Sequence, residues 1–306
     1  MYDVIIIGSG SAGLTAAIYT TRANLKTLVI AGGKWGGQLM LTTVVDNYPG
    51  FAEGIQGPDL MLAMRKQAER FGAEIIEEDF SDADFSPPAG GPFKVLAGGK
   101  TYEGKAVIIA TGADTKWLDV PGEKEKIGKG VSSCAPCDAF FFKGKDVIVV
   151  GGGDSAMEEA LVLVNFATEI TVVHRSETLR ASAIMQKKAM ENPKIKFVFN
   201  TVVTKILGDE KVTGVELKNN KTGETSKIDL DGVFVAIGHI PNTMKFKGIE
   251  LDEKGYIVVH NHTKTNTEGV FVAGDVHDSH YRQAVTAAGY GCMAALEVDH
   301  WIRGQE

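Results

Sequence analysis

The chain has 306 residues, of which 44% are hydrophobic and 23% charged, with a formal net charge of −7 and a pI near 5.6. The length suits two domains of ordinary size, and the composition is that of a globular protein, not of a coiled coil or a disordered chain. An acidic chain is a poor match for nucleic acid or an anionic membrane surface, so neither is expected as a partner. No run of about 20 apolar residues is present to span a bilayer, and no basic leader precedes the first apolar run, so we expect a cytoplasmic protein.

The amino-terminal segment predicts a dinucleotide-binding unit. Residues 4–7 form an apolar run typical of a strand buried on both faces, and a glycine turn and a helical pattern follow it. In such a Gly-x-Gly-x-x-Gly turn the first glycine permits the bend, the second lets the backbone approach a pyrophosphate, and the third allows close helix packing. The helix N-terminus then offers free N–H groups to phosphate oxygens. The residues expected to contact the cofactor here are Gly8, Gly10, Ser11, Ala12 and Gly13.

One feature of such units is missing from this chain. The next apolar run, residues 27–30, ends in Ala31-Gly32-Gly33, where an Asp or Glu normally accepts from a ribose hydroxyl. We expect the ribose to be held another way, for example by backbone groups of the following loop. Polar, turn-rich loops after a strand build ligand sites in α/β folds. The candidate residues in these loops are Gly36, Gly37, Gln38, Leu39 and Asn47.

The rest of the first unit is predicted from periodicity and turn signals. Residues 59–71 carry apolar side chains at helical spacing, and Gly72 ends that helix. Between residues 74 and 102, short alternating segments with Pro87-Pro88 and Gly90-Gly91 predict a small antiparallel β layer. Residues 107–110 then form a buried strand, and the two residues after it, Thr111 and Gly112, are further cofactor candidates.

The centre of the chain holds a Cys-x-x-Cys pair, Cys134-Ala135-Pro136-Cys137, followed directly by Asp138. Such a pair is typical of a zinc half-site or a redox couple. Zinc requires four ligands, whereas the third cysteine, Cys292, lies in an apolar helical pattern and is expected in the core, so we predict no metal. A purely structural disulfide would close too short a loop to constrain the unfolded chain. Redox chemistry is therefore the leading interpretation.

A second strand, glycine turn and helix follow the cysteines. Residues 146–150 lead into a glycine turn with candidate residues Gly151, Gly153, Asp154, Ser155 and Ala156. The next strand, residues 169–173, ends in His174-Arg175, and Arg180 lies five residues further on. A guanidinium at this position is the natural partner of a ribose 2′-phosphate, so His174, Arg175 and Arg180 are candidates; the alternative is two surface arginines.

The last part of the chain returns to the first pattern. Residues 232–238 close the second unit, and residues 269–275 form a buried strand ending in Asp275 before the final helix. Asp275 is expected either to accept from a cofactor sugar hydroxyl or to cap a helix. The cofactor candidates here are Gly274, Asp275, Arg282, Gln283 and Ala284. Two fingerprints in one chain indicate two dinucleotides or a gene fusion. Because a dithiol needs a flavin between itself and nicotinamide, we assign FAD to the first unit and a nicotinamide to the second.

Over essentially its whole length the chain resembles the low-molecular-weight thioredoxin reductases of the bacterial and archaeal type. The resemblance implies a homodimer with an α/β fold of two Rossmann-like dinucleotide-binding domains, the second inserted in the first. It places an FAD domain at residues 1–112 and 240–306, and an NAD(P)H domain carrying the dithiol at residues 113–239. The matching stretches are the two glycine turns, residues 36–39, 47–50 and 110–112, Cys134 to Asp138, and residues 238–242, 274–276 and 281–284.

The same resemblance implies a role for each residue of the dithiol site. Cys137 is the sulfur nearer the flavin, Cys134 attacks the disulfide of thioredoxin or a thioredoxin-like protein, and Asp138 is the acid/base. The alternative for Asp138 is a helix cap. Both nicotinamide and dithiol must reach one flavin, so rotation about linkers near Gly112 and Gly238 is expected.

The basic motif departs from the family pattern. Ser176 replaces the second arginine of the family's His-Arg-Arg. Arg175 and Arg180 still favour NADPH, which is the predicted donor. Because one arginine is missing, NADH or another donor stays open. A flavin-dependent dithiol oxidase, a reductase of another disulfide protein and a non-catalytic flavin-binding redox sensor are the alternative functions.

Overall fold

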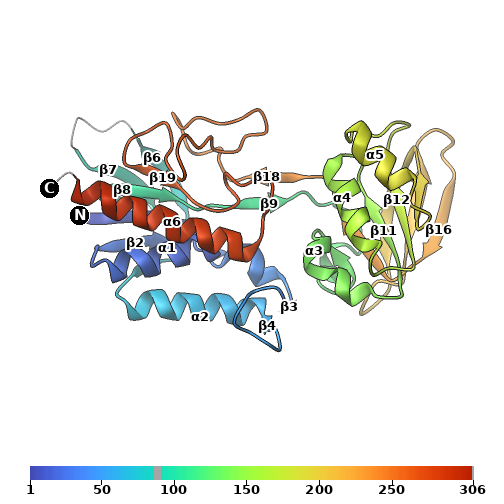
Figure 1. Cartoon of the computed structure of the whole chain (residues 1–306), viewed down its shortest axis with the longest axis horizontal. Helices are drawn as coiled ribbons and strands as arrows, with labels where there is room; N and C mark the ends of the chain where they lie inside the picture. The colour runs from blue at the N-terminus through green and yellow to red at the C-terminus, as the bar shows by residue number, and fades with distance from the viewer. Residues whose placement is uncertain (86–90, 305–306) are drawn as a thin grey trace. The chain divides into compact units, whose positions relative to one another are not determined.

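The computed structural model describes residues 1–85 and 91–304 and divides into two compact units (Figure 1). One unit contains Met1–Asp114 and Ile240–Glu306, and the other contains Thr115–His239. Each is built on its own largely parallel sheet with helices packed on it. The predicted α/β class with two Rossmann-like parts is confirmed.

The sheet of the first unit is centred on β1 (Tyr2–Ile7). Its neighbours are β2 (Thr27–Ile30) and β8 (Lys100–Ile109), and outside these lie β5 (Glu74–Ile76) and β19 (Val270–Val272), all parallel where they pair. The apolar side chains of β1 and β2 are buried on both faces, which is why these strands read as uninterrupted apolar runs in the sequence.

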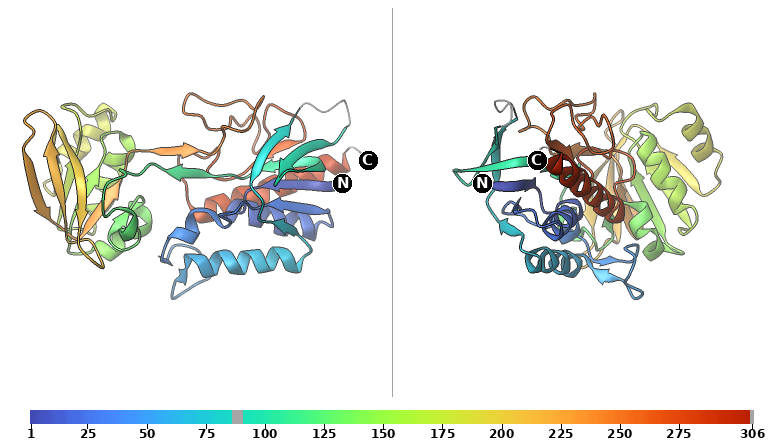
Figure 2. Two further views of the ribbon diagram at one scale, coloured as in Figure 1. Left: turned by 180° about the vertical axis from the view of Figure 1, so that it is seen from behind. Right: turned by 60° about the vertical axis from the view of Figure 1, so that its left-hand side comes forward.

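Three helices cover one face of this sheet: α1 (Ser11–Arg22), α2 (Gly57–Arg70) and α6 (Ala284–Arg303) (Figures 1 and 2). Helices α1 and α6 pack closely because both carry small residues at their contact. A Cβ at Gly291 would lie 2.1 Å from the carbonyl oxygen of Ala12.

The residue next to Gly291, Cys292, is only partly buried, which corrects the prediction of a core thiol.

The opposite face is covered by apolar side chains of the antiparallel layer and of the segment before β19. Strands β6 (Phe80–Asp84) and β7 (Phe93–Ala97) run antiparallel to each other, and β7 pairs with the first half of β8. These strands confirm the predicted antiparallel layer, although Pro87, Pro88 and Gly90 lie outside the described residues. The first unit also contains η1 (Gly37–Leu41) and the strand pair β3 (Val44–Val45) and β4 (Ile55–Gln56).

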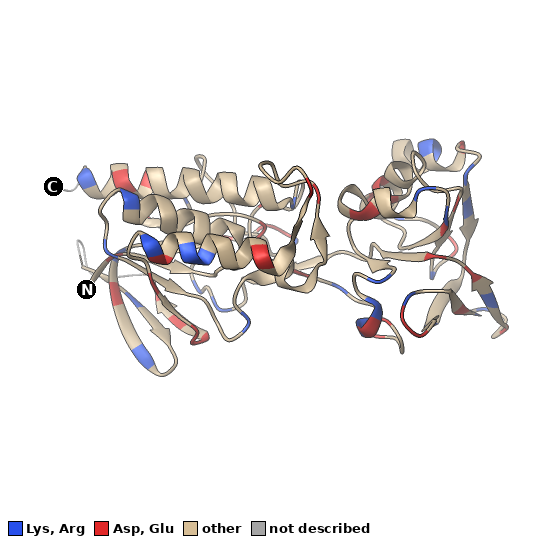
Figure 3. Ribbon diagram, turned by 90° about the horizontal axis from the view of Figure 1, so that it is seen from below, with Lys and Arg blue, Asp and Glu red and all other residues tan. Residues whose placement is uncertain are grey.

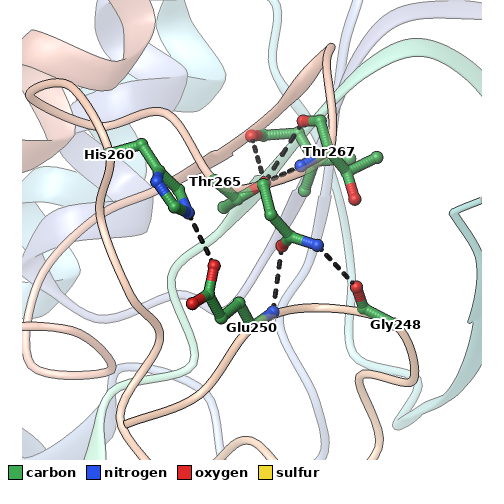
Figure 4. A network of polar contacts seen from close by, with 7 residues as sticks. Gly248, Glu250, His260, Thr265 and Thr267 are labelled. Carbon is green, nitrogen blue, oxygen red and sulfur yellow. Dashed lines mark hydrogen bonds and ion pairs between the residues drawn. The ribbon is translucent and has the colours of Figure 1, made fainter.

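The segment between residues 248 and 267 is held by side-chain hydrogen bonds (Figure 4). The Asn266 amide nitrogen donates to the carbonyl oxygen of Gly248 at 2.8 Å, and its oxygen accepts from the backbone N–H of Glu250 at 2.9 Å. His260 Nε2 lies 2.8 Å from the carboxylate of Glu250. These bonds fix a loop that has no helix of its own and supplies apolar residues to the sheet face.

The second unit has a fully parallel sheet with β11 (Asp146–Val150) at its centre. On one side lie β12 (Glu169–Val173) and β13 (Ile195–Val198), and on the other β17 (Gly232–Val235) and β10 (Val131–Ser132). One face carries α3 (Ala135–Asp138), α4 (Asp154–Leu163) and α5 (Ala183–Met190). The other face carries the antiparallel strands β14 (Thr201–Leu207), β15 (Gly214–Asn219) and β16 (Thr225–Asp229). The second unit also contains two short 3-10 helices, η2 (Lys124–Lys126) and η3 (Ala139–Phe142).

The chain connects the units through two segments that pair with each other. Strands β9 (Ala113–Thr115) and β18 (His239–Pro241) form a two-stranded sheet. Next to them, Gly112 and Gly238 have φ values of +68° and +107°, which glycine adopts without the cost that a side chain would bring.

Basic and acidic residues are interspersed along the elements of each unit (Figure 3). Over residues 1–85 and 91–304, no helix combines the length and the apolar character that crossing a membrane requires.

The close packing of α1 on α6 generates a prediction with a control in the same helix. The Gly291→Ala variant should lose about 1–3 kcal/mol of unfolding free energy, because its methyl group overlaps the Ala12 carbonyl. Gly289→Ala should instead gain about 0.5–1 kcal/mol, since a Cβ at that exposed helix position meets nothing within 4 Å. Urea unfolding of both variants tests the packing; equal effects of the two substitutions would contradict it.

Candidate functional site

The first glycine turn lies between β1 and α1, and its three glycines differ in their surroundings. A Cβ at Gly8 would lie 2.2 Å from the carbonyl oxygen of Ala110, and one at Gly13 would lie 2.0 Å from that of Gly8. By contrast, a Cβ at Gly10 would meet nothing within 4 Å, and Gly10 is the N-cap of α1 without a side-chain cap. The turn therefore leaves open backbone at the helix N-terminus, where an anion is favoured.

Predicted site residues from four other segments gather around this turn. Gly37 packs near the backbone of Gly10, and a Cβ on Gly274 would lie 2.8 Å from the side chain of Ala12. Thr111 Oγ1 donates to the carbonyl oxygen of Asn242 at 2.9 Å. The side chain of Asn47 donates to that of Gln283 at 3.1 Å, which ties the loop after β3 to the start of α6. Among the other candidates in these segments, Ser11 and Ala12 are buried, Leu39 and Ala284 are partly buried, and Gln38 donates to Asp114 at 3.0 Å.

Sequence reasoning missed two polar residues at this edge. The hydroxyl of Ser9 donates to the carbonyl oxygen of Ala31 at 3.1 Å and accepts from the backbone N–H of Gly36 at 3.0 Å. Asp79, which follows β5, accepts from the backbone N–H of Gly33 at 2.9 Å. A carboxylate therefore does lie beside the loop after β2, but it comes from a neighbouring strand. The only sequence signal was its position just beyond a strand that pairs with β2.

The carboxyl group of Asp275 has a strongly raised pKa. The residue is partly buried, and its Oδ1 atom is buried without a hydrogen-bond partner among the described residues. Burial, together with the negative charge of Asp278, raises its pKa from 3.8 to about 7. The start of α6 is capped by Gln283 and Thr286 instead, so the capping alternative for Asp275 is not what the structure shows. A buried acceptor without a partner is costly, and a ligand hydroxyl would satisfy it.

The turn between Asp275 and α6 is held by Asp278. Its carboxylate accepts from the backbone N–H groups of His280, Tyr281 and Arg282. Arg282 has a φ of +49°, an uncommon conformation for a residue with a side chain. The turn therefore presents Arg282 and the start of α6 in one fixed arrangement.

In the second unit, Cys134 and Cys137 form a disulfide with Cα atoms 5.3 Å apart. Cys137 is exposed and Cys134 is partly buried. The backbone N–H of Cys134 donates to the hydroxyl of Ser132 at 3.0 Å. Burial raises the pKa of the neighbouring Asp138 carboxyl, and a hydrogen bond from Ser132 opposes that shift in part. A carboxyl group beside the disulfide that keeps its proton to higher pH is suited to proton transfer.

The second glycine turn repeats the arrangement of the first. A Cβ at Gly151 would lie 2.3 Å from the carbonyl oxygen of Ala236, whereas one at Gly153 would meet nothing within 4 Å. Gly153 is the N-cap of α4 and has no side-chain cap, and the Asp154 carboxylate accepts from the backbone and hydroxyl of Ser182. In the first turn of α4, Ala156 is buried and Ser155 is partly buried. An open backbone position again lies at a helix N-terminus.

The basic loop after β12 is anchored on this turn. The backbone N–H of Arg180 donates to the carbonyl oxygen of Gly152 at 2.7 Å, and the side chains of Arg175 and Arg180 are exposed. His174 is buried, packs against Gly152 and has its Nε2 3.0 Å from the carbonyl oxygen of Thr178. The ring of His174 therefore shapes the loop, while the two arginines remain available to an anion.

Two parallel α/β units, each with an open glycine turn, and a Cys-x-x-Cys disulfide define a disulfide oxidoreductase of the Rossmann-like class. A family model for the pyridine nucleotide-disulphide oxidoreductases matches residues 2–291. The chain belongs to this family.

Similar proteins agree with the family model over the full length. A thioredoxin reductase from Mycolicibacterium smegmatis is 53% identical and covers 100% of this chain and 98% of that protein. A bifunctional thioredoxin reductase/thioredoxin from Mycobacterium leprae is 50% identical over 99% of this chain and 66% of that protein. The solved thioredoxin reductase of Giardia duodenalis matches with a TM-score of 0.94 and 46% identity, covering 99% of both chains. The resemblance drawn from the sequence motifs is thereby confirmed.

The raised pKa of Asp275 predicts a pH-dependent stability. Its pKa in the folded protein lies above the ordinary value, so the folded state binds this proton more tightly than the unfolded state. Ionising it should cost on the order of 4 kcal/mol, absent below pH about 4 and complete above pH about 7. In flavin-free protein, Asp275→Asn should remove this loss, and Asp82→Asn, at an exposed position on β6, should not. Unfolding at pH 5 and pH 8 measures both, and an unchanged pH dependence in Asp275→Asn contradicts the assignment.

Proposed function

We propose that the chain is a thioredoxin reductase that passes electrons from NADPH through FAD and the Cys134–Cys137 disulfide to thioredoxin or a thioredoxin-like protein. The observation that carries the proposal is this disulfide, with a carboxyl group of raised pKa beside it, in the same unit as an open glycine turn. The names of the similar proteins support it, and one of them joins thioredoxin reductase and thioredoxin in one chain.

FAD is proposed to bind a domain of residues 1–112 and 240–306, which lies within the first unit. The open backbone at Gly10 suits a pyrophosphate, and the unpartnered oxygen of Asp275 suits a sugar hydroxyl. Asp79 replaces the missing ribose acid in this proposal, because it lies at the loop where that acid is normally found. When bound, the flavin converts hydride transfer from nicotinamide into reduction of a disulfide.

A domain of residues 113–239, which includes the whole second unit, is proposed to bind the nicotinamide and to carry out thiol–disulfide exchange. After reduction, the Cys134 thiolate attacks the partner disulfide, a mixed disulfide forms, and one partner sulfur leaves as a thiolate. The Cys137 thiolate then attacks Cys134 and releases the second partner sulfur. Asp138 supplies and recovers a proton, so that the enzyme dithiol becomes a disulfide and the partner disulfide becomes a dithiol.

The linkers are proposed to let the second unit turn, since one flavin must serve both the nicotinamide and the disulfide. Gly112 and Gly238 stand beside the two paired connecting segments, in backbone conformations that favour glycine. The assembly is proposed to be a homodimer, as in the family that the sequence resembles, and the location is proposed to be the cytoplasm.

NADPH is the proposed donor because Arg175 and Arg180 are exposed beside the second glycine turn. Arg175→Ala should raise the apparent Kd for NADPH in flavin reduction about 10- to 100-fold by removing a charge-assisted hydrogen bond to the 2′-phosphate. The reaction with NADH should be unchanged, and Lys188→Ala, at an exposed position on α5, should have no effect on either. Anaerobic stopped-flow bleaching of the flavin band with each nucleotide measures this. If Arg175→Ala weakened the reaction with NADPH and with NADH equally, Arg175 would not recognise the 2′-phosphate.

The thioredoxin step is tested by replacing each kind of cysteine. In Cys134→Ser, NADPH-dependent reduction of thioredoxin should fall at least about 10³-fold, because no thiol is left to attack the partner disulfide. Reduction of the flavin by NADPH should persist. Cys292→Ser is the matched control and should keep full turnover, since that thiol lies on α6 outside the disulfide.

Parallel measurement of oxygen consumption separates the alternatives. Rapid oxygen uptake without thioredoxin reduction would favour a dithiol oxidase, and flavin that no pyridine nucleotide reduces would favour a sensor.

A further inference from the structure

Glu159 on α4 contacts the backbone between the two cysteines. Its carboxylate Oε2 accepts a hydrogen bond from the backbone N–H of Ala135. Ala135 is fully buried and is the first residue of α3, and the N-cap of α3, Cys134, provides no side-chain cap. Glu159 therefore takes the place of a cap for the short helix that carries the disulfide.

This contact lies wholly inside the second unit and rests on apolar packing. Ala135 and Ala139 pack in one buried cluster with Ala156, Met157 and Ala160 of α4. Because α3 and α4 are fixed against each other in this way, the carboxylate stays beside the disulfide in any arrangement of the two units.

The position of this charge has a consequence for the redox equilibrium. The disulfide carries no charge, whereas its reduced form yields thiolates at alkaline pH. A carboxylate next to the dithiol repels a thiolate, so it destabilises the reduced form relative to the disulfide. The carboxyl group of Asp138 also neighbours the pair, and Glu159 differs from it by accepting directly from the backbone between the cysteines.

We propose that Glu159 is a positioning residue that anchors α3 and, through its negative charge, makes the Cys134–Cys137 pair a stronger reductant. The proposal rests on the redox role of these cysteines in the proposed function. A stronger reductant drives electrons more completely to an acceptor disulfide.

Two substitutions at this position separate the charge from the anchor. Glu159→Gln keeps an oxygen that accepts from Ala135 but removes the charge, and Glu159→Ala removes both. Glu158→Gln is the matched control, because it removes one charge from an exposed position of the same helix.

The test equilibrates each flavin-bound protein anaerobically at pH 8.5 with mixtures of reduced and oxidised dithiothreitol. A dithiothreitol thiolate attacks one sulfur of the disulfide and expels the other, and its second thiol closes the ring, leaving an enzyme dithiol and oxidised dithiothreitol. Acid quenching, alkylation and mass spectrometry then count modified Cys134 and Cys137. Cys292 provides an internal standard, since it is outside the disulfide in every sample.

In Glu159→Gln, the equilibrium constant for reduction of the disulfide should rise about tenfold, equal to about 30 mV for this two-electron couple. Glu158→Gln should match the parent protein. The proposal is overturned if the midpoint of Glu159→Gln equals that of the parent protein. If Glu159→Ala shifts the midpoint in that case, the residue anchors α3 and its charge has no effect on the redox equilibrium. If alkylation of Cys134 and Cys137 does not respond to dithiothreitol in the parent protein, the proposed function itself fails.

Discussion

Both units depend on the close approach of a glycine turn to the end of a neighbouring strand. At Gly8 and at Gly151 any side chain would overlap a carbonyl oxygen, of Ala110 in one case and of Ala236 in the other. This approach sets the start of the following helix directly above the strand ends, and it leaves the next turn position, Gly10 or Gly153, open. The same constraint that packs each helix on its sheet thus also creates a backbone surface for phosphate.

What differs between the units is the set of side chains around that turn. The first contains an acid, Asp275, whose Oδ1 is buried without a partner among the described residues, and loops that are tied together by Ser9 and Asn47. The second presents exposed guanidinium groups on a loop anchored by Gly152. Neutral hydroxyls suit the first surface and an additional phosphate suits the second, which is why one backbone design serves two different dinucleotides in the proposed function.

The sequence was sufficient for the features that depend on neighbouring residues. Strands buried on both faces, such as β1 and β11, are visible as apolar runs, and the glycine turns follow them directly. Contacts between distant segments were not visible: Asp79 reaches Gly33 only because β5 pairs with β2, and Glu159 reaches Ala135 only because α3 packs on α4. Cys292 was misjudged for a related reason, since an apolar helix pattern does not tell which side of a long helix its neighbours leave uncovered.

Two carboxyl groups in different surroundings, Asp138 and Glu159, lie close to the disulfide in sequence or through a backbone hydrogen bond. Asp138 is partly buried, and this burial favours its protonated form, which suits it to give and take a proton. Glu159 accepts a hydrogen bond from the backbone N–H of Ala135, and in our proposal it carries a negative charge close to the cysteines. In our proposal one carboxyl group holds a proton while the other holds a charge, because the local partners of the two groups differ. In our proposal, this division lets a site of two cysteines combine proton transfer with ready release of electrons to a second disulfide.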